Sequence, residues 1–209
     1  MRPSASRNFG DSPQLRLDQW GGRKVLLRFP LERAPRDRRV LRACVRLFVT
    51  KVETNERGAF PDLPTCVAMY DLDTPWTERG ATFLTSDGTT PWRQGKGIGK
   101  AGYGAVGAVS APDAGAHLRR DLIPLDPRKV TAGSWMKLDV TDFARERIRA
   151  GDRELDLLAG PSELARNWYF RSREAPEADQ RPHLLVEVAD AVEDFRLESA
   201  TSLDWKPGQ

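Results

Sequence analysis

Histidine is scarce in this chain, which has only two, His117 and His183, among 209 residues. They show no HExxH spacing, and the chain has no G-x-S-x-G motif around a nucleophilic serine. A histidine-based catalytic triad or a histidine-rich metal site is therefore difficult to build. Paired carboxylates could still hydrolyse a glycosidic bond, but among 30 acidic residues such pairs arise by chance. The sequence favours a protein that is not an enzyme.

Cysteine is equally scarce, with Cys44 and Cys66 in two predicted strands. Alternation along the first strand makes Cys44 point away from the core. Its predicted inward residues are Ala43, Val45, Leu47 and Val49, and its outward residues are Cys44, Arg46 and Phe48. A disulfide would require neighbouring strands with closely spaced Cα atoms. Two unpaired thiols are the favoured interpretation, because sequential strands need not align these positions.

Long apolar runs and a strong charge excess are also missing. No run approaches the roughly 18 residues of a membrane span, and the start, MRPSASRNFG, lacks the apolar region of a signal peptide. The net charge is only +3, from 33 basic and 30 acidic residues. Because basic residues are spread among acidic ones, we expect neither a nucleic-acid partner nor a membrane partner.

The sequence does contain many short apolar segments between turn signals, which is typical of a β-sandwich or barrel. The segment at 24–29, KVLLRF, is continuously apolar, as in a strand covered on both faces. Near 140–150 the period changes to that of a helix, with Val140, Phe143, Ala144 and Ile148 on one side. Asp139 or Thr141 could cap this helix, and Gly151 could end it.

Several motifs occur in the order found in one known family. They are NFGDSPQLRL, KVLLRFPL, RACVRLFV, WTERGATF, WMKLDVTDFARERI, YFRSREA and RPHLLVEV. In these motifs, over roughly residues 7 to 188, the chain resembles the DNRLRE domain. That domain overlaps a carbohydrate-binding module family found in alginate lyases and other polysaccharide-degrading proteins.

The resemblance implies an all-β fold, a jelly-roll-like antiparallel β-sandwich, with one short helix near 140–150. It also implies a polysaccharide ligand, secretion as part of a larger protein, and neighbouring domains in that protein. We expect the sandwich to occupy residues 1–190. Residues 191–209 lack sandwich periodicity and are predicted to be a linker or the start of a following module.

The best candidates for ligand binding lie in a glycine-rich stretch between 85 and 120. Arginine can hold a uronate carboxylate with two hydrogen bonds, lysine can meet it as a point charge, and an aromatic ring can stack on a sugar. The stretch supplies these types in Trp92, Arg93, Lys96, Lys100 and Tyr103. A second candidate surface is the outward face of the strand NWYFR, at Tyr169 and Arg171.

Other conspicuous residues have structural interpretations. The run Ser172-Arg173-Glu174 is expected to be structural, with Glu174 paired to Arg28 inside the sandwich, and Trp76 is expected to pack in the core or at a sheet edge. No D-x-D-x-D-type loop argues for calcium, although a structural calcium ion is compatible with a sandwich module.

The sequence therefore predicts a non-catalytic carbohydrate-binding module for an acidic polysaccharide such as alginate or another uronate polymer. No cofactor is expected. Two alternatives stay open: a structural or adhesive β-sandwich domain without a glycan site, and a polysaccharide lyase or hydrolase.

Overall fold

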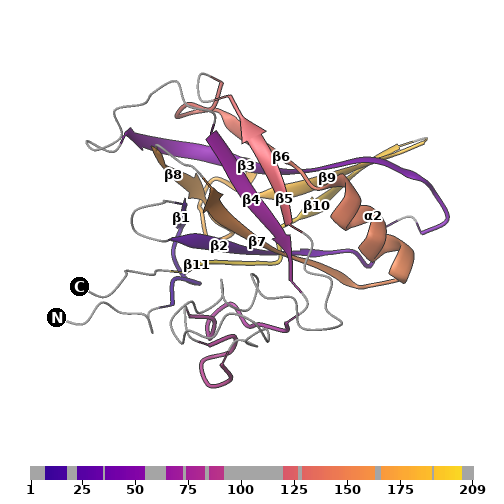
Figure 1. The fold of residues 1–209 in the computed structure, drawn as a ribbon, viewed down its shortest axis with the longest axis horizontal. Helices are drawn as coiled ribbons and strands as arrows, with labels where there is room; N and C mark the ends of the chain where they lie inside the picture. The colour runs from indigo at the N-terminus through magenta and orange to yellow at the C-terminus, as the bar shows by residue number, and fades with distance from the viewer. Residues whose placement is uncertain are drawn as a thin grey trace.

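The computed structural model describes residues 8–17, 23–34, 36–54, 65–72, 74–82, 85–91, 120–126, 129–162, 166–189 and 191–203. Within these segments the chain forms two antiparallel β-sheets that pack face to face, with one α-helix at an end (Figure 1). The predicted all-β sandwich with a short helix is confirmed. No helix in these segments is long and apolar enough to cross a membrane.

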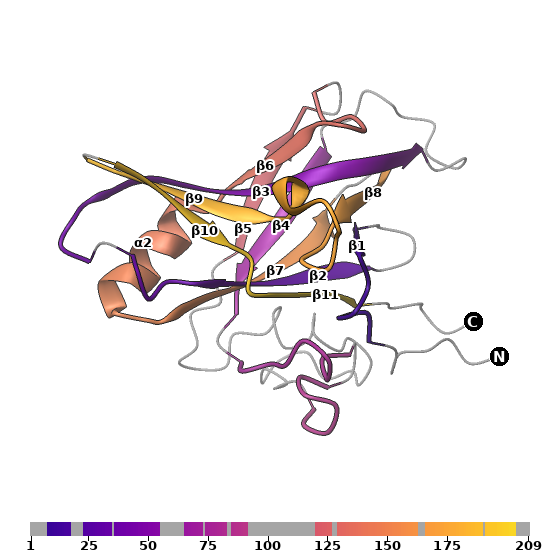
Figure 2. The ribbon, with the colours of Figure 1, turned by 180° about the vertical axis from the view of Figure 1, so that it is seen from behind.

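The larger sheet has six strands in the described part of the chain. They are β1 (Gln14–Leu17), β8 (Arg166–Arg171), β3 (Val40–Thr54), β9 (His183–Val188), β10 (Ala191–Arg196) and β6 (Trp135–Asp139). β8 pairs with residues 49–54 of β3 and β9 with residues 40–46. β6 pairs with residues 44–48 and lies on the other edge of β3 (Figure 2). β3 thus holds three strands of this sheet in register.

The smaller sheet has five described strands. Their order is β11 (Ser199–Leu203), β2 (Lys24–Pro30), β7 (Glu154–Ser162), β4 (Thr65–Asp71) and β5 (Arg120–Leu125). Between β2 and β8 the chain changes sheets at every connection except that between β4 and β5, as in jelly-roll sandwiches. β2 is buried on both faces along most of its length, as its continuous apolar run predicts.

The main core lies between the two sheets. The predicted inward residues of β3 are all buried there, and Cys44, Arg46 and Phe48 lie on the outer face as expected. Trp168 and Phe170 of β8 are also fully buried. A smaller cluster covers the outer face of the smaller sheet and consists of Leu26, Leu72, Trp76, Ala81 and Leu158. Trp76 is 2% exposed, so its predicted packing role is confirmed.

The helix α2 (Thr141–Ala150) lies where the sequence predicts and ends at Gly151, but its N-cap residue is Val140, without a side-chain cap, rather than Asp139 or Thr141. The Asp139 carboxylate accepts hydrogen bonds from the N–H and the hydroxyl of Thr141, at 3.0 and 2.6 Å. Gly151 ends the helix with a φ of 81°, a left-handed conformation that glycine adopts readily. The Thr141 hydroxyl also accepts a hydrogen bond from the N–H of Ala43, at 3.0 Å, which ties the helix to β3.

The sandwich continues beyond residue 190, where the sequence predicts a linker. β10 pairs with β9 in the larger sheet, and β11 pairs with β2 in the smaller sheet. Phe195, Leu197 and Ala200 contribute buried side chains to the main core. The predicted boundary is therefore too early, and residues 204–209 lie outside the described part of the chain.

Ending the chain after residue 190 should destabilise the domain strongly. The truncation removes Phe195 and Leu197 from the core, at about 1.5–3 kcal/mol each, and leaves the β2 edge unpaired. Because about 1 kcal/mol shifts the melting temperature by about 2–4 °C at this size, we expect a fall of about 10 °C or loss of folding. Thermal unfolding should be compared with a chain ending after Leu203, and equal melting temperatures would contradict the assignment.

Candidate functional site

The first predicted site lies outside the described residues. Trp92, Arg93, Lys96, Lys100 and Tyr103 all fall between positions 92 and 119, a range that the structure does not describe. Their role in ligand binding stays a prediction. The second predicted surface, at Tyr169 and Arg171, can be examined directly.

Tyr169 lies on the outer face of β8, as alternation predicts, but its side chain is engaged within the protein. Arg16 of β1 and Lys51 of β3 lie over its ring, 5.0 and 5.5 Å from the centroid. These residues stand opposite Tyr169 on the two neighbouring strands. The Tyr169 hydroxyl donates a hydrogen bond of 2.6 Å to Glu53. The ring is therefore not open for stacking on a sugar.

Arg171 is also used internally. Its guanidinium donates hydrogen bonds to Glu177 at 3.0 Å and to Gln180 at 3.2 Å. Both partners belong to the connection between β8 and β9, Gln180 within the short 3-10 helix Ala178–Gln180. Arg171 thus stabilises this connection, and its charge is already balanced by Glu177.

A row of basic residues lies farther along the same sheet, and one of them, Arg196, pairs with Asp194 at 3.3 Å. The strand registers place Lys137 of β6 opposite Arg46 of β3, Arg46 opposite His183 of β9, and His183 opposite Arg196 of β10. Residues directly opposite one another on neighbouring strands point to the same face. These four residues, called the basic row below, therefore cross four strands on the outer face. Lys137 and Arg196 are exposed, whereas His183 is 5% exposed.

Trp135 holds the centre of the basic row in place. The guanidinium carbon of Arg46 lies 4.7 Å from the Trp135 ring centroid, which is a cation–π distance. The rings of His183 and Phe48 meet Trp135 edge-on, at 4.9 and 5.3 Å between centroids. Burial lowers the pKa of His183 below its usual value of 6.5, and the charges of Arg46 and Arg196 lower it further. His183 is therefore neutral at pH 7, and the charge of the row comes from Lys137, Arg46 and Arg196.

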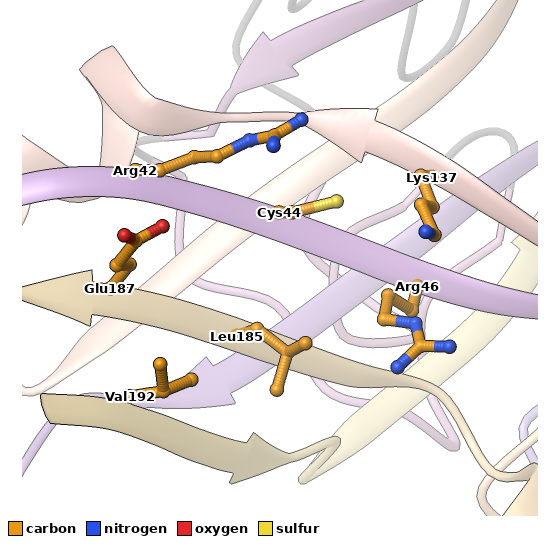
Figure 3. A pocket seen from close by; sticks show the side chains of 7 residues that line it. All are labelled: Arg42, Cys44, Arg46, Lys137, Leu185, Glu187 and Val192. Atoms are coloured by element: carbon orange, nitrogen blue, oxygen red, sulfur yellow. The ribbon is translucent and has the colours of Figure 1, made fainter.

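A hollow of about 300 Å³ opens beside this row, across β3, β6, β9 and β10 (Figure 3). It is lined by Arg42, Cys44, Arg46, Lys137, Leu185, Glu187 and Val192. Figure 3 shows the Cys44 thiol between the end of Arg42 and Lys137. Within the described residues Arg42 and Lys137 form no ion pair or hydrogen bond. Three cations against one carboxylate make this hollow favourable for an anion.

The Cys44 thiol belongs to the floor of this hollow and is unpaired, as is Cys66. The two cysteines lie in different sheets, Cys44 in β3 and Cys66 in β4, which confirms the favoured interpretation of the sequence. Burial raises the pKa of the Cys44 thiol. The group is therefore protonated at pH 7 and acts as a small, weakly polar surface.

A second hollow, of about 410 Å³, lies at the smaller sheet and differs in its charges. Arg28 donates to both oxygens of Asp156, at 2.8 and 3.1 Å, and the Trp76 indole donates to Asp156 at 2.8 Å. Arg147 pairs with Asp71 at 2.9 Å and with Asp152 at 3.1 Å. These ion pairs occupy Arg28 and Arg147, and the hollow is best explained as structural.

The predicted pair between Arg28 and Glu174 is wrong. Asp156 stands opposite Arg28 on the neighbouring strand β7, whereas Glu174 follows β8 of the other sheet. Glu174 instead pairs with Arg173 at 2.8 Å.

The run 172–174 nevertheless has the structural role that the sequence predicts. The Ser172 hydroxyl donates to the carbonyl of Ser12 at 2.6 Å and accepts from the N–H of Glu174 at 3.0 Å. Arg173 pairs with Glu78 at 2.7 Å and donates to the carbonyl of Glu198. The run therefore connects the end of β8 to three other segments of the chain.

No group of three His, Cys, Asp or Glu residues in the described segments could hold a metal ion. No family model matches the chain, and no curated protein is significantly similar to it. The resemblance to the DNRLRE domain therefore stays a prediction.

Sequence reasoning missed the basic row because its members are far apart in the chain. Alternation along each strand predicts that each of these side chains points outward, but only the registers between strands show that they are neighbours.

Replacing Tyr169 with phenylalanine should test its internal role. Hydrogen bonds from Lys51 and from Tyr169 lower the pKa of Glu53 to about 2. Removing the hydroxyl should raise that pKa towards its usual value of 4.5, as measured by NMR titration of the carboxyl carbon.

The same substitution should also change how the free energy of unfolding depends on pH. Because the folded-state pKa of Glu53 is depressed, its stabilising contribution is present above about pH 4.5 and lost as the pH falls towards 2. The variant should therefore be less stable than the wild type at pH 7, and the difference should shrink on acidification. A difference that is unchanged down to pH 3 would contradict the assigned hydrogen bond.

Proposed function

We propose that this protein is a non-catalytic carbohydrate-binding module for an acidic polysaccharide such as alginate or another uronate polymer. The contact surface is the outer face of the larger sheet, along the basic row and the hollow beside it. The observation that carries the proposal is the presence of open cations, Lys137 and Arg42, next to the Trp135-supported Arg46 on one exposed face.

This arrangement matches the chemistry of a chain of uronate residues. Each residue offers a carboxylate, which arginine meets with paired donors and lysine with a point charge. Arg42 and Lys137 face solvent and have no ion pair within the described residues, so they can bind an external anion without first breaking one. Arg46 is also pre-oriented by the Trp135 ring, so that less conformational entropy is lost on binding.

The two outer faces of the sandwich differ in whether their cations are already ion-paired. On the smaller sheet Arg28 and Arg147 are already paired, and the cluster around Trp76 covers part of the surface. On the larger sheet Glu187 is the one carboxylate among the residues that line the hollow. The larger sheet is therefore the better surface for a polyanion.

The resemblance to the DNRLRE domain supports the same class of ligand. On the same resemblance we also propose that the protein is secreted as part of a larger protein and that catalytic or adhesive domains lie beside it. The main alternative is a structural or adhesive sandwich domain. A folded protein that binds no acidic glycan would favour this alternative. Release of unsaturated or reducing sugars from alginate by the purified protein would instead favour a lyase or hydrolase.

Replacing Lys137 with alanine should weaken binding to alginate. An exposed charge contact contributes up to about 1 kcal/mol, which is about fivefold in affinity. The loss should shrink at high salt, because the Debye length falls from about 10 Å at 0.1 M to about 3 Å at 1 M. Affinity electrophoresis in alginate gels at both salt concentrations measures the effect. Arg196→Ala should have a smaller effect of the same sign, because Arg196 already pairs with Asp194 at 3.3 Å.

Arg79→Ala is the matched control, because it removes one positive charge from an exposed side chain, 83% exposed, that contacts Asp11 rather than the basic row. Trp92→Ala tests the loop that the sequence favours. If Arg79→Ala and Lys137→Ala change retardation equally, net charge alone explains the binding and the site is wrong. A loss confined to Trp92→Ala would move the site to residues 92–103. Equal affinity for double-stranded DNA would indicate general polyanion binding.

A further inference from the structure

The hollow beside the basic row combines two kinds of surface. Arg42 and Lys137 are exposed and supply positive charge at its rim, and Arg46 is half-buried. Its floor and part of its wall are formed by Cys44, Leu185 and Val192, and Glu187 forms the rest of the wall (Figure 3). Val192 is 64% exposed, one of two large apolar side chains that stand out in this way among the described residues. An anion alone would use the rim and leave this apolar part uncovered.

The floor offers little to a hydroxyl group. Leu185 and Val192 have no polar side-chain atoms, and the Cys44 thiol contacts the carbonyl of Val45, at 3.6 Å. Thiols are weak donors and weak acceptors. A sugar hydroxyl pressed onto this floor would lose its hydrogen bonds to water without replacement, which is unfavourable. A methyl-bearing substituent loses no such bonds and gains from leaving water.

The charged rim restricts the occupant further. Arg42 and Lys137 have no ion-pair partner in the described segments and favour a carboxylate at the mouth of the hollow. The ligand must therefore carry a negative charge and a short apolar group close to each other. An uncharged apolar ligand would leave the cations unused, and an unsubstituted uronate would place hydroxyls on the floor.

We propose that the hollow binds an O-acetylated uronate residue, with the acetyl methyl group over Cys44 and Leu185 and the carboxylate between Arg42 and Lys137. This inference rests on the proposed function and deepens it, because it distinguishes among acidic polysaccharides. Val192 covers the acetyl group from the β10 side. The basic row then contacts the following, charged residues of the same polymer.

Two forms of one polymer test the inference directly. O-acetylated alginate and the same sample after mild alkaline de-esterification differ in their acetyl esters and share their carboxylates and chain length. Isothermal titration calorimetry at 0.1 M salt should give the wild type about fourfold higher affinity for the acetylated form, as expected for burying one methyl group. Val192→Ser should remove most of this preference, because its affinity for the acetylated form should fall further than its affinity for the de-esterified form.

Matched variants separate the apolar contact from the charge contact. Leu41→Ser changes an exposed apolar side chain on the same sheet that does not line the hollow, and it should keep the full preference. Lys137→Ala should weaken binding to both forms by the same factor. Thermal unfolding establishes that each variant is folded before its binding is measured.

The outcomes distinguish the two proposals. Equal affinity of the wild type for both forms, or tighter binding of the de-esterified form, overturns the acetyl subsite and leaves acidic-polysaccharide binding intact. A preference that survives in Val192→Ser also overturns it. If neither form binds, the proposed function fails and this inference fails with it. A preference that Val192→Ser abolishes and Leu41→Ser retains supports the subsite.

Discussion

The alternation of side chains along β3 is the constraint on which the rest of this structure depends. This 15-residue strand buries Ala43, Val45 and Leu47 between the sheets and directs Cys44 and Arg46 outward. Its two edges position β6, β8 and β9. Since the side-chain period is two, a shift of one residue would exchange the faces and place arginines in the core. The core therefore fixes which residues the outer face can present.

The basic row follows from that constraint. Burial of β3, β6 and β9 on one side determines their registers, and the registers bring Lys137, Arg46 and His183 side by side. Like charges on an exposed face repel one another only weakly in water, and Trp135 offsets part of that cost at Arg46 through its ring. The same core that stabilises the fold thus maintains a surface that an acidic polymer can neutralise.

Much of this could be predicted from the sequence, and the failures have common physical causes. The faces of β3, the C-terminal end of the helix and the burial of Trp76 follow from local periodicity and composition. The partner of Arg28 does not, because the choice between Asp156 and Glu174 depends on which strand lies beside β2. β10 escaped prediction because it is an edge strand, with Phe195 as its single buried side chain. The basic row could not be predicted for the same reason as the partner of Arg28. The register between strands that are distant in the sequence cannot be derived from local periodicity.

The central claim is that the outer face of the larger sheet binds an acidic polysaccharide. Amide NMR spectra of the isotopically labelled protein, titrated with alginate oligomers, test it most directly. The account predicts that the shifted resonances map to Arg42, Arg46, Lys137 and Arg196 and to their neighbours on β3, β6, β9 and β10. Shifts confined to the smaller sheet around Arg28 and Asp156, or no shifts at saturating oligomer, would contradict it.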